Sequence, residues 1–468
     1  MLRSKKYWRF VPTLLAVAVL CACGSKGDNY QKPEMPLPAA FKESALWKPA
    51  NPQAAAVPDD WWLLFNDPVL TQLEAQVIVG NETLKANAAQ YRIARAAVDS
   101  ARSALYPTLG VGASASRADP GGAAGPSNSF QLSGSANWEV DLWGRVAGEV
   151  SAAQARLQAS ADDVAAARLS IQATLAQTYL SLRSTEAQET LLQSTLVAFQ
   201  RSYDLTQNRY NAGVASAADV AQAESQLKAT QAQLLDVTAS RAQLEHAVAV
   251  LLGKAPADLN IARTGVLPGA PEVPTLLPAT LLERRPDIAA AERRVAAANA
   301  QIGVAQSAFF PDLTLSAAAG FRSASLGSLI SAPNLFWSIG PALALTVFDG
   351  GARRAAVESA RASTELAAAN YRQTVLTALQ EVEDNLVLGS SLQEQDVVQT
   401  QALAAARRGL EITNNQYRAG TVSFLNVAAA QADALGAERT LLALRSRRLA
   451  AINQLLKNIA GRWDKPVS

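Results

Sequence analysis

The 468-residue sequence predicts a mainly α-helical protein that also contributes four strands to a membrane β-barrel. Three observations predict this class. The ranges 127–255 and 342–465 contain no proline, as is typical of very long helices. Shorter stretches alternate apolar residues with small or polar ones, which is the period of β-strands. Several motifs also recur about two hundred residues apart, so the chain is internally duplicated.

Residues 1–22 have the pattern of a secretion signal. Basic residues precede an apolar run from Val11 to Leu20, which is too short to span a bilayer as a helix, since that takes about 20 residues. The run ends in Leu20-Cys21-Ala22-Cys23-Gly24, which resembles a bacterial lipobox. Cleavage after Ala22 would leave Cys23 as the acylated N-terminus. Lipoproteins retained in the inner membrane commonly carry Asp after this cysteine, and the Gly24 found here resembles those sent to the outer membrane. An ordinary signal peptide with an incidental cysteine is the alternative.

The mature chain divides into a tether and two repeats. Residues 23–60 are rich in proline and polar residues and are expected to form an extended tether. The first repeat is expected over 61–265 and the second over 266–468. Two pairs of motifs support the duplication: Asn208 to Gly213 matches Asn415 to Gly420, and Ala104 to Leu109 matches Ala308 to Leu313.

Each repeat contains one very long helix. The first is expected from Gly144 to Tyr210, about 100 Å at about 1.5 Å per residue. Leu175, Tyr179 and Leu182 fall at i, i+4 and i+7 and should form one buried face. No single compact domain contains a rod of this length, so coiled-coil-like packing with close approach at the many alanines is expected.

The strand segments flank two loops, at 119–129 and 322–334. Apolar residues alternate with small polar ones, as in the segment from Phe130 to Asp141. A soluble sheet with one wet face shows the same alternation. Four strands cannot close a membrane barrel alone, because open edges cannot lie in lipid. Two, three or four chains would give 8, 12 or 16 strands, and periodicity does not choose among them.

Composition excludes several classes of function. The formal charge of +2 argues against a nucleic-acid-binding chain. The single histidine, His246, excludes a His-rich metal site, and the only cysteines, Cys21 and Cys23, exclude a disulfide framework or a nucleophilic cysteine in the body. No phosphate loop, Ser/His/Asp set or paired-carboxylate cleft stands out. We therefore expect no enzyme activity, cofactor or metal.

Several motifs, in order, resemble those of the outer membrane efflux protein family, in its lipoprotein branch that serves tripartite drug pumps. They are Trp61-Trp62 with Phe65 to Pro68, Asp141 to Arg145, Leu281 to Ile288, Ala300 to Gly303, and Phe309 to Pro311. The resemblance implies a homotrimer with a 12-stranded barrel in the outer membrane, lipid-anchored, and an α-helical tunnel through the periplasm. It also implies a periplasmic adaptor and an inner-membrane RND-type proton-driven transporter as partners. Such a duct exports drugs or other small toxic compounds passively.

The same resemblance assigns roles near the two turns that follow the long helices. Gly213 and Gly420 are expected to be left-handed helix caps, and the family places these turns, with Tyr210 and Tyr417, at the periplasmic tip that faces the adaptor. Leu425 matches a constricting apolar position of the family's gate. Relatives carry an acid and an arginine where this chain has Ala429 and Ala432, so the ionic lock is in doubt. An acidic ring is the alternative, with the candidates Asp433, Asp219 and Glu224; solvated helix charges are equally compatible.

Two other functions remain open at this point. The same architecture could serve protein secretion with an ATP-driven partner. A periplasmic coiled-coil scaffold lipoprotein without a pore is a more remote possibility, which the paired amphipathic strands disfavour.

Overall fold

The computed structural model describes residues 30–35, 42, 60–119, 121, 125–271 and 285–459. The predicted signal peptide, Cys23 and most of the tether lie outside these residues, as does the Leu281 to Arg284 part of the repeat signature. The chain divides into two compact units. Unit 1 contains the described residues of Met1–Met35, Ala89–Asp162 and Ile288–Thr374, and unit 2 those of Pro36–Ala88, Asp163–Asp287 and Val375–Ser468.

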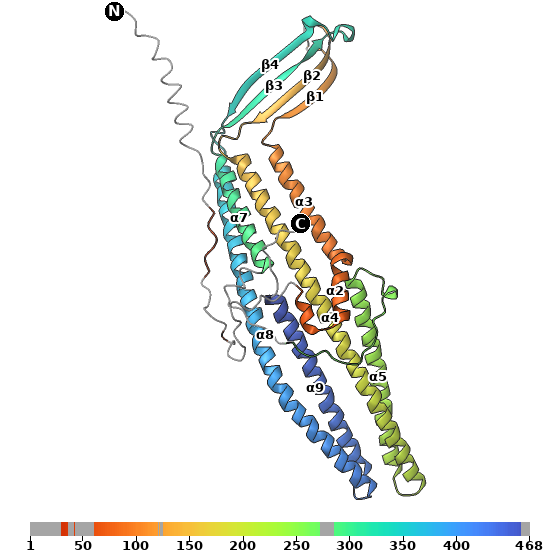
Figure 1. The fold of residues 1–468 in the computed structure, drawn as a ribbon. Coiled ribbons are helices and arrows are strands. Elements are labelled where there is room, and N and C mark those ends of the chain that lie inside the picture. Colours follow the sequence, from red (N-terminus) through yellow and green to blue (C-terminus); the bar gives the residue numbers. More distant parts are fainter. Residues whose placement is uncertain are drawn as a thin grey trace, which may run out of the picture. The chain divides into compact units, whose positions relative to one another are not determined.

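The first repeat contributes two short helices, a β-hairpin and a long helical hairpin (Figure 1). Its elements are the 3-10 turn η2 (Trp61–Phe65), α2 (Pro68–Gly80), α3 (Glu82–Ser103), β1 (Thr108–Ala118), β2 (Ser127–Glu139), α4 (Arg145–Asn211), α5 (Ala217–Leu251) and the 3-10 turn η4 (Pro256–Asp258). The second repeat gives α7 (Pro286–Ser307), β3 (Asp312–Ser323), the 3-10 turns η5 (Leu326–Ser328) and η6 (Ala332–Asn334), β4 (Leu335–Ala344), α8 (Ala352–Arg418) and α9 (Phe424–Ile459).

The bounds of the first long helix were predicted closely, and the second repeat also contains a very long helix, as expected. The helix expected from Gly144 to Tyr210 runs from Arg145 to Asn211, and α8 has the same length of 67 residues, about 100 Å. The predicted face of Leu175, Tyr179 and Leu182 is fully buried. Across the described ranges, no helix has both the length and the apolar content that a bilayer crossing needs.

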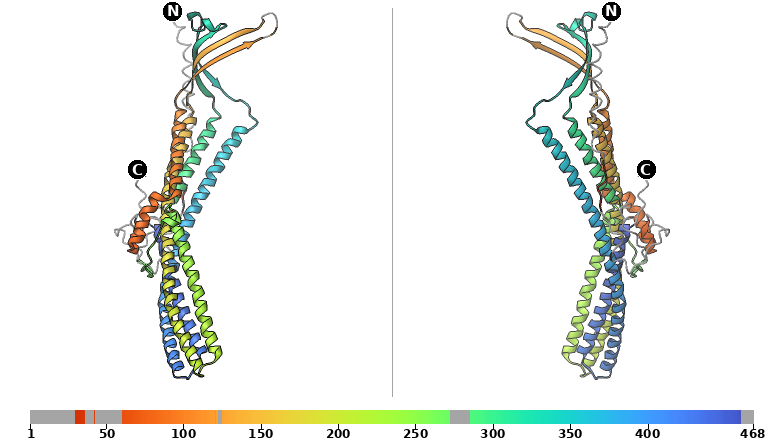
Figure 2. Two further views of the ribbon diagram at one scale, coloured as in Figure 1. Left: turned by 90° about the vertical axis from the view of Figure 1, so that its right-hand side faces the viewer. Right: turned by 90° about the vertical axis from the view of Figure 1, so that its left-hand side faces the viewer.

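The four strands form one antiparallel sheet in unit 1, in the order β1-β2-β3-β4 (Figure 1), and Figure 2 shows the β1–β2 hairpin in orange from two further sides. The central β2–β3 pair joins the two repeats, with Ala136 opposite Ala317. The register places the apolar residues of all four strands in the same rows: Leu109–Ala136–Ala317–Ile339, Val111–Gly134–Ala319–Trp337 and Ala113–Leu132–Phe321–Leu335. Because alternate residues share a face, the sheet has one continuous apolar face and one face rich in Ser, Thr, Gly and Asn.

The apolar face is open to solvent in the single chain. Val111 is 86 % exposed and Trp337 is 74 % exposed. An exposed apolar face of this extent marks a surface that contacts lipid or another protein. β1 and β4 each pair with only one neighbour, so both edges of the described sheet are unpaired.

Two of the sequence motifs meet at the base of the sheet. The Trp143 ring stacks on Phe310 with the ring centroids 4.8 Å apart, and Trp143 Nε1 donates to the Pro311 carbonyl at 2.7 Å. Arg145 next to it donates to both carboxylate oxygens of Glu139, at 2.8 and 2.6 Å. These contacts join the start of α4 to the segment that enters β3, within unit 1.

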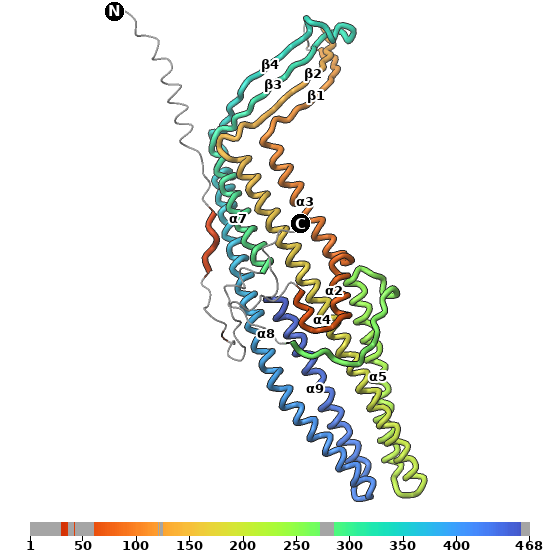
Figure 3. Tube along the Cα trace, in the orientation of Figure 1, coloured from red at the N-terminus to blue at the C-terminus, as the bar shows by residue number. Residues whose placement is uncertain are grey.

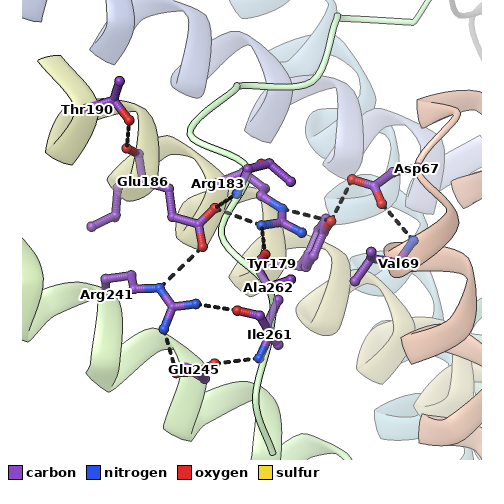
Figure 4. Close-up of polar contacts among 12 residues, drawn as sticks. Asp67, Val69, Tyr179, Arg183, Glu186, Thr190, Arg241, Glu245, Ile261 and Ala262 are labelled. Carbon is purple, nitrogen blue, oxygen red and sulfur yellow. Dashed lines mark hydrogen bonds and ion pairs between the residues drawn. The ribbon is translucent and has the colours of Figure 1, made fainter.

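A buried network of charged groups connects α4, α5 and the segment after α5 in unit 2 (Figure 4). Arg183 and Glu186 on α4 are each 1 % exposed, and Arg183 Nη1 lies 2.7 Å from Glu186 Oε2. Glu186 also accepts from Arg241 Nε on α5 at 3.2 Å. The two arginines donate to the carbonyls of Ala262 and Ile261, at 2.8 and 2.6 Å. The network therefore binds the segment after α5 to both helices.

The same network extends to the N-terminus of α2. The Tyr179 hydroxyl accepts from Arg183 Nε at 2.8 Å and donates to Asp67 Oδ2 at 2.6 Å. Asp67 Oδ1 caps α2 by accepting from the Val69 amide at 2.9 Å. One chain of hydrogen bonds thus fixes α2, α4, α5 and residues 261–262 relative to one another within unit 2.

Candidate functional site

The two predicted turns are present at the same end of unit 2 (Figure 3). Gly213 follows α4 with φ +73°, and Gly420 follows α8 with φ +76°. After the first glycine, the Val214 amide donates to the Arg209 carbonyl at 2.8 Å, which is the bond of a Schellman cap. The left-handed caps expected from the sequence are therefore confirmed. Nothing lies within 4 Å of a Cβ built on either glycine, so backbone conformation, rather than crowding, requires glycine there.

The two tyrosines that match in sequence differ in burial. Tyr210 is 45 % exposed, whereas Tyr417 is 6 % exposed. Tyr417 packs edge-on against Phe424, with the ring centroids 5.8 Å apart, and both belong to a buried cluster with Val427, Ala428 and, from α5, Ala223. This cluster joins the second turn to the first hairpin.

Arg209, at the end of α4, ties the two hairpins together. Its guanidinium lies over the Tyr417 ring, 4.6 Å from the centroid, and its Nη1 donates to the Tyr417 carbonyl at 3.1 Å. The Tyr417 hydroxyl lies 3.4 Å from Thr206 Oγ1. Arg209 Nε is buried and has no hydrogen-bond partner in the described part of the chain. Sequence reasoning missed Arg209 and Thr206, because their partner lies more than 200 residues away and is visible only in the fold.

The predicted gate residues lie on one face of α9. Leu425, Ala429, Ala432 and Asp433 are all exposed, and they follow the i, i+4, i+7, i+8 spacing of one helical face. Leu425 is 63 % exposed. Phe424, Val427, Ala428 and Gln431, on the other side of the helix, are buried. The helix therefore presents the whole predicted gate set away from its own protomer's core.

The three acidic candidates differ in how their carboxylates are used. Asp219 closes a capping box at the start of α5: it accepts from the amide and hydroxyl of Ser216 at 3.0 and 2.8 Å, and Ser216 Oγ accepts from the Asp219 amide at 3.1 Å. Glu224 and Asp433 are exposed. A helix-capping role thus accounts for Asp219, and Asp433 alone shares a face with Leu425.

His246 and Arg285 have ordinary surroundings. His246 is exposed on α5. Arg285, before α7, pairs with Asp287 at 2.6 Å and with Glu381 at 2.8 Å, so its charge is used within the fold. Among the described residues, no group of three His, Cys, Asp or Glu side chains is placed to hold a metal ion.

Comparison with known proteins gives a consistent result. The family model described as "Outer membrane efflux protein" matches residues 74–254 and 277–461. The toluene efflux pump outer membrane protein TtgF of Pseudomonas putida is 32 % identical over 465 residues, covering 96 % of each chain. Outer membrane protein OprJ of Pseudomonas aeruginosa is 31 % identical over 470 residues, covering 97 % of this chain and 96 % of its own length.

Solved structures agree in fold. The outer-membrane channel OprN superimposes with a TM-score of 0.86 at 31 % identity, over 93 % of this chain and 99 % of that one. The Neisseria gonorrhoeae MtrE outer membrane channel, solved in its open state, gives a TM-score of 0.81 at 25 % identity, over 92 % of this chain and 97 % of that one. The predicted fold class is therefore confirmed over nearly the whole described chain.

Proposed function

The chain belongs to the outer membrane efflux protein family, and we propose that three copies of it assemble into one transport duct. It is an outer-membrane channel protein, the exit duct through which an efflux pump releases drugs or other small toxic compounds. The relatives named for toluene and antibiotic efflux are consistent with small, largely apolar cargo. The duct itself performs no chemistry in this proposal, and the transport energy comes from its partners.

The apolar face of the four-stranded sheet carries the proposal of a multi-chain assembly. This face is suited to lipid, but strands with open edges cannot remain in a bilayer, because their backbone groups have no water to bind. Closure requires β1 of one chain to pair with β4 of the next. Three chains with four strands each then give twelve strands, with the polar face lining a wet lumen.

Native mass measurement of the detergent-extracted protein tests the assembly. We expect a trimer of chains that begin at acylated Cys23. A detergent-independent monomer would refute pairing between β1 and β4 of neighbouring chains. The mass of the N-terminal peptide tests the lipid separately, because an unmodified or differently cleaved N-terminus would remove the anchor and leave the trimer untouched.

The two turns are the proposed contact with a periplasmic adaptor, which in turn joins an inner-membrane RND-type proton-driven transporter. Support comes from their position at one end of unit 2 and from the exposed Tyr210 beside Gly213. Valine at Gly213 or Gly420 would strain a left-handed backbone by about 1–2 kcal/mol and shift the turn. We expect weaker crosslinking to the adaptor and lower drug resistance. The matched control is Gly409→Val, inside α8 with open space around its Cα, which should change neither readout.

The exposed face of α9 is the proposed gate. Leu425, Ala429, Ala432 and Asp433 would meet their counterparts from the other two chains around the axis of the tunnel. In this arrangement Leu425 supplies an apolar constriction and Asp433 a ring of three carboxylates, which favours cations. Glu224 lies on α5 and is expected to contribute less. Asp219 is committed to its capping box and is expected to contribute to the fold of the turn instead.

A further inference from the structure

In the described stretch 30–35, which precedes the repeats, the side chain of Tyr30 contacts α7. The Tyr30 hydroxyl donates to Glu292 Oε1 and also lies 3.4 Å from the Glu292 carbonyl. Residues 30–35 have no helix or strand of their own, and Gln31, Lys32 and Glu34 are exposed. All these residues belong to unit 1. A part-buried hydrogen bond therefore joins the chain after the predicted lipid site to the helix that leads into the membrane sheet.

The acceptor is built into the helical core of unit 1. Glu292 is 7 % exposed, and its second oxygen accepts from Arg293 Nε at 2.6 Å. Arg293 reaches on to Gln158 on α4 at 3.3 Å. Burial and then the nearby Glu292 charge raise the pKa of Tyr371 on α8, which is itself 2 % exposed. Glu292 thus lies among three helices, and Tyr30 supplies the donor for its remaining oxygen.

Chain lengths relate this contact to the lipid. From Cys23 to Tyr30 a fully extended chain reaches about 25 Å, at about 3.3–3.6 Å per residue. From Glu292 to Ser307, the end of α7, the helix rises about 22 Å, and β3 begins soon after, at Asp312. The segment is just long enough for a lipid on Cys23 to reach the base of the membrane sheet from the Tyr30 contact.

We propose that Tyr30 is a positioning residue that latches the lipid tether of each protomer onto Glu292 of its own α7, holding the acyl chains beside the entry to β3. The proposal rests on the acylation of Cys23 proposed above. The number of residues between Cys23 and Tyr30 then limits how far the lipid can lie from Glu292. An N-terminal segment that anchored the protein only through its lipid would not need a partner for the Tyr30 hydroxyl.

A spin label at Gln31→Cys tests the latch in the full-length, acylated trimer. The body of the mature chain has no other free cysteine, so labelling is specific. We expect a slowly moving nitroxide, and a several-fold shorter correlation time when Tyr30→Phe removes only the hydroxyl. The matched control is Tyr106→Phe, on a 69 % exposed tyrosine, which should leave the label slow. In a Glu292→Ala background Tyr30→Phe should have no further effect. Equal mobility with and without the Tyr30 hydroxyl would overturn the latch.

Shortening the chain between Cys23 and Tyr30 tests whether its length links the lipid to the Tyr30–Glu292 contact. Deleting Lys26, Gly27 and Asp28 reduces the reach from Cys23 to Tyr30 to about 14 Å, less than the rise of α7 beyond Glu292. In the acylated protein the deletion should free the label, while in a Cys23→Ser chain exported behind a non-lipoprotein signal it should not. A label that stays slow in the acylated deletion variant would refute the claim that the length of this chain places the lipid.

Acylation itself is read from the mass of the N-terminal peptide. A slow, Tyr30-dependent label on a chain that proves to be unacylated would keep the latch but refute its role in placing a lipid. An acylated chain with a mobile label would refute the latch and leave the anchor intact. Unchanged thermal unfolding of the Tyr30→Phe variant would show that release of the tether, rather than general loosening of unit 1, accounts for the faster label.

Discussion

Glu74 on α2 offers the sharpest test of the energetics of unit 2. The residue is fully buried, and among the described residues neither of its carboxylate oxygens has a hydrogen-bond partner. Burial raises its pKa from an ordinary 4.5 to about 9. The folded chain therefore holds a proton at neutral pH that the unfolded chain releases. Folding becomes less favourable as the pH rises, because the proton must be taken from an increasingly dilute supply.

The sign and size of the effect follow from the two pKa values. Below about pH 4.5 both states are protonated, and Glu74 causes no pH dependence. Between about 4.5 and 9 the free energy of unfolding falls by about 1.4 kcal/mol per pH unit. At pH 7 the accumulated loss is about 3 kcal/mol. The variant Glu74→Gln has nearly the same shape and no proton to take up, so it should recover this amount at pH 7 and almost nothing at pH 4.5.

Thermal unfolding of the detergent-solubilised protein, followed by tryptophan fluorescence at a fixed scan rate, measures the difference. The Tm of Glu74→Gln should exceed that of the parent by several degrees at pH 7 and by more at pH 8.5, and the two should converge near pH 5. Glu365→Gln, on an exposed glutamate of α8, is the matched control and should show no such trend. A lower Tm for Glu74→Gln at pH 7, or a gap that does not change with pH, would show that Glu74 is ionised and paired in the folded protein.

Three further changes test the tip and the buried network. Asp433→Asn should lower the cation preference of single channels in planar bilayers, and unchanged selectivity would remove Asp433 from the proposed acidic ring. Arg209→Met removes the guanidinium from the Tyr417 ring and its hydrogen bond to the turn, so resting conductance should rise; a conductance equal to that of the parent would show that this tie does not hold the tip. Arg183→Met leaves Glu186 buried with one arginine fewer and should cost about 3–5 kcal/mol, seen as a large drop in Tm. A drop of less than about 1 kcal/mol would show that Arg241 alone neutralises Glu186.

Local patterns were sufficient to predict the elements. The helix predicted from Gly144 to Tyr210, in a stretch without proline, matches α4 within one residue at each end. Asn81 caps α3 by accepting from the Leu84 amide at 3.0 Å. These features depend on residues within one or two turns of each other, where spacing in sequence and spacing in space are the same.

Contacts between distant segments were not predictable in this way. The alternation within each strand showed which residues share a face, but not that β2 pairs with β3 in a register that aligns Leu132 with Phe321. Likewise, nothing around Glu292 in the sequence points to Tyr30, 262 residues earlier. Such pairings depend on how long helices return the chain to the same place, and no short motif reports that.

The two tyrosines at matching positions of the repeats have different surroundings, which their sequence motifs did not predict. Tyr210 and Tyr417 occupy matching positions, and the motif around them suggested equal roles. Their surroundings differ because the residue that begins the following helix differs: Ala217 in the first copy and Phe424 in the second. The Phe424 ring gives Tyr417 an edge-on partner and a buried cluster, while Tyr210 has only an alanine at that position and remains exposed. The Arg209 contact then falls on the buried tyrosine. Differences next to the matching tyrosines, Phe424 in place of Ala217 and Arg209 in place of Gln416, thus accompany a packing role for Tyr417 and a surface position for Tyr210, so the tip of the unit is asymmetric although its turns are alike.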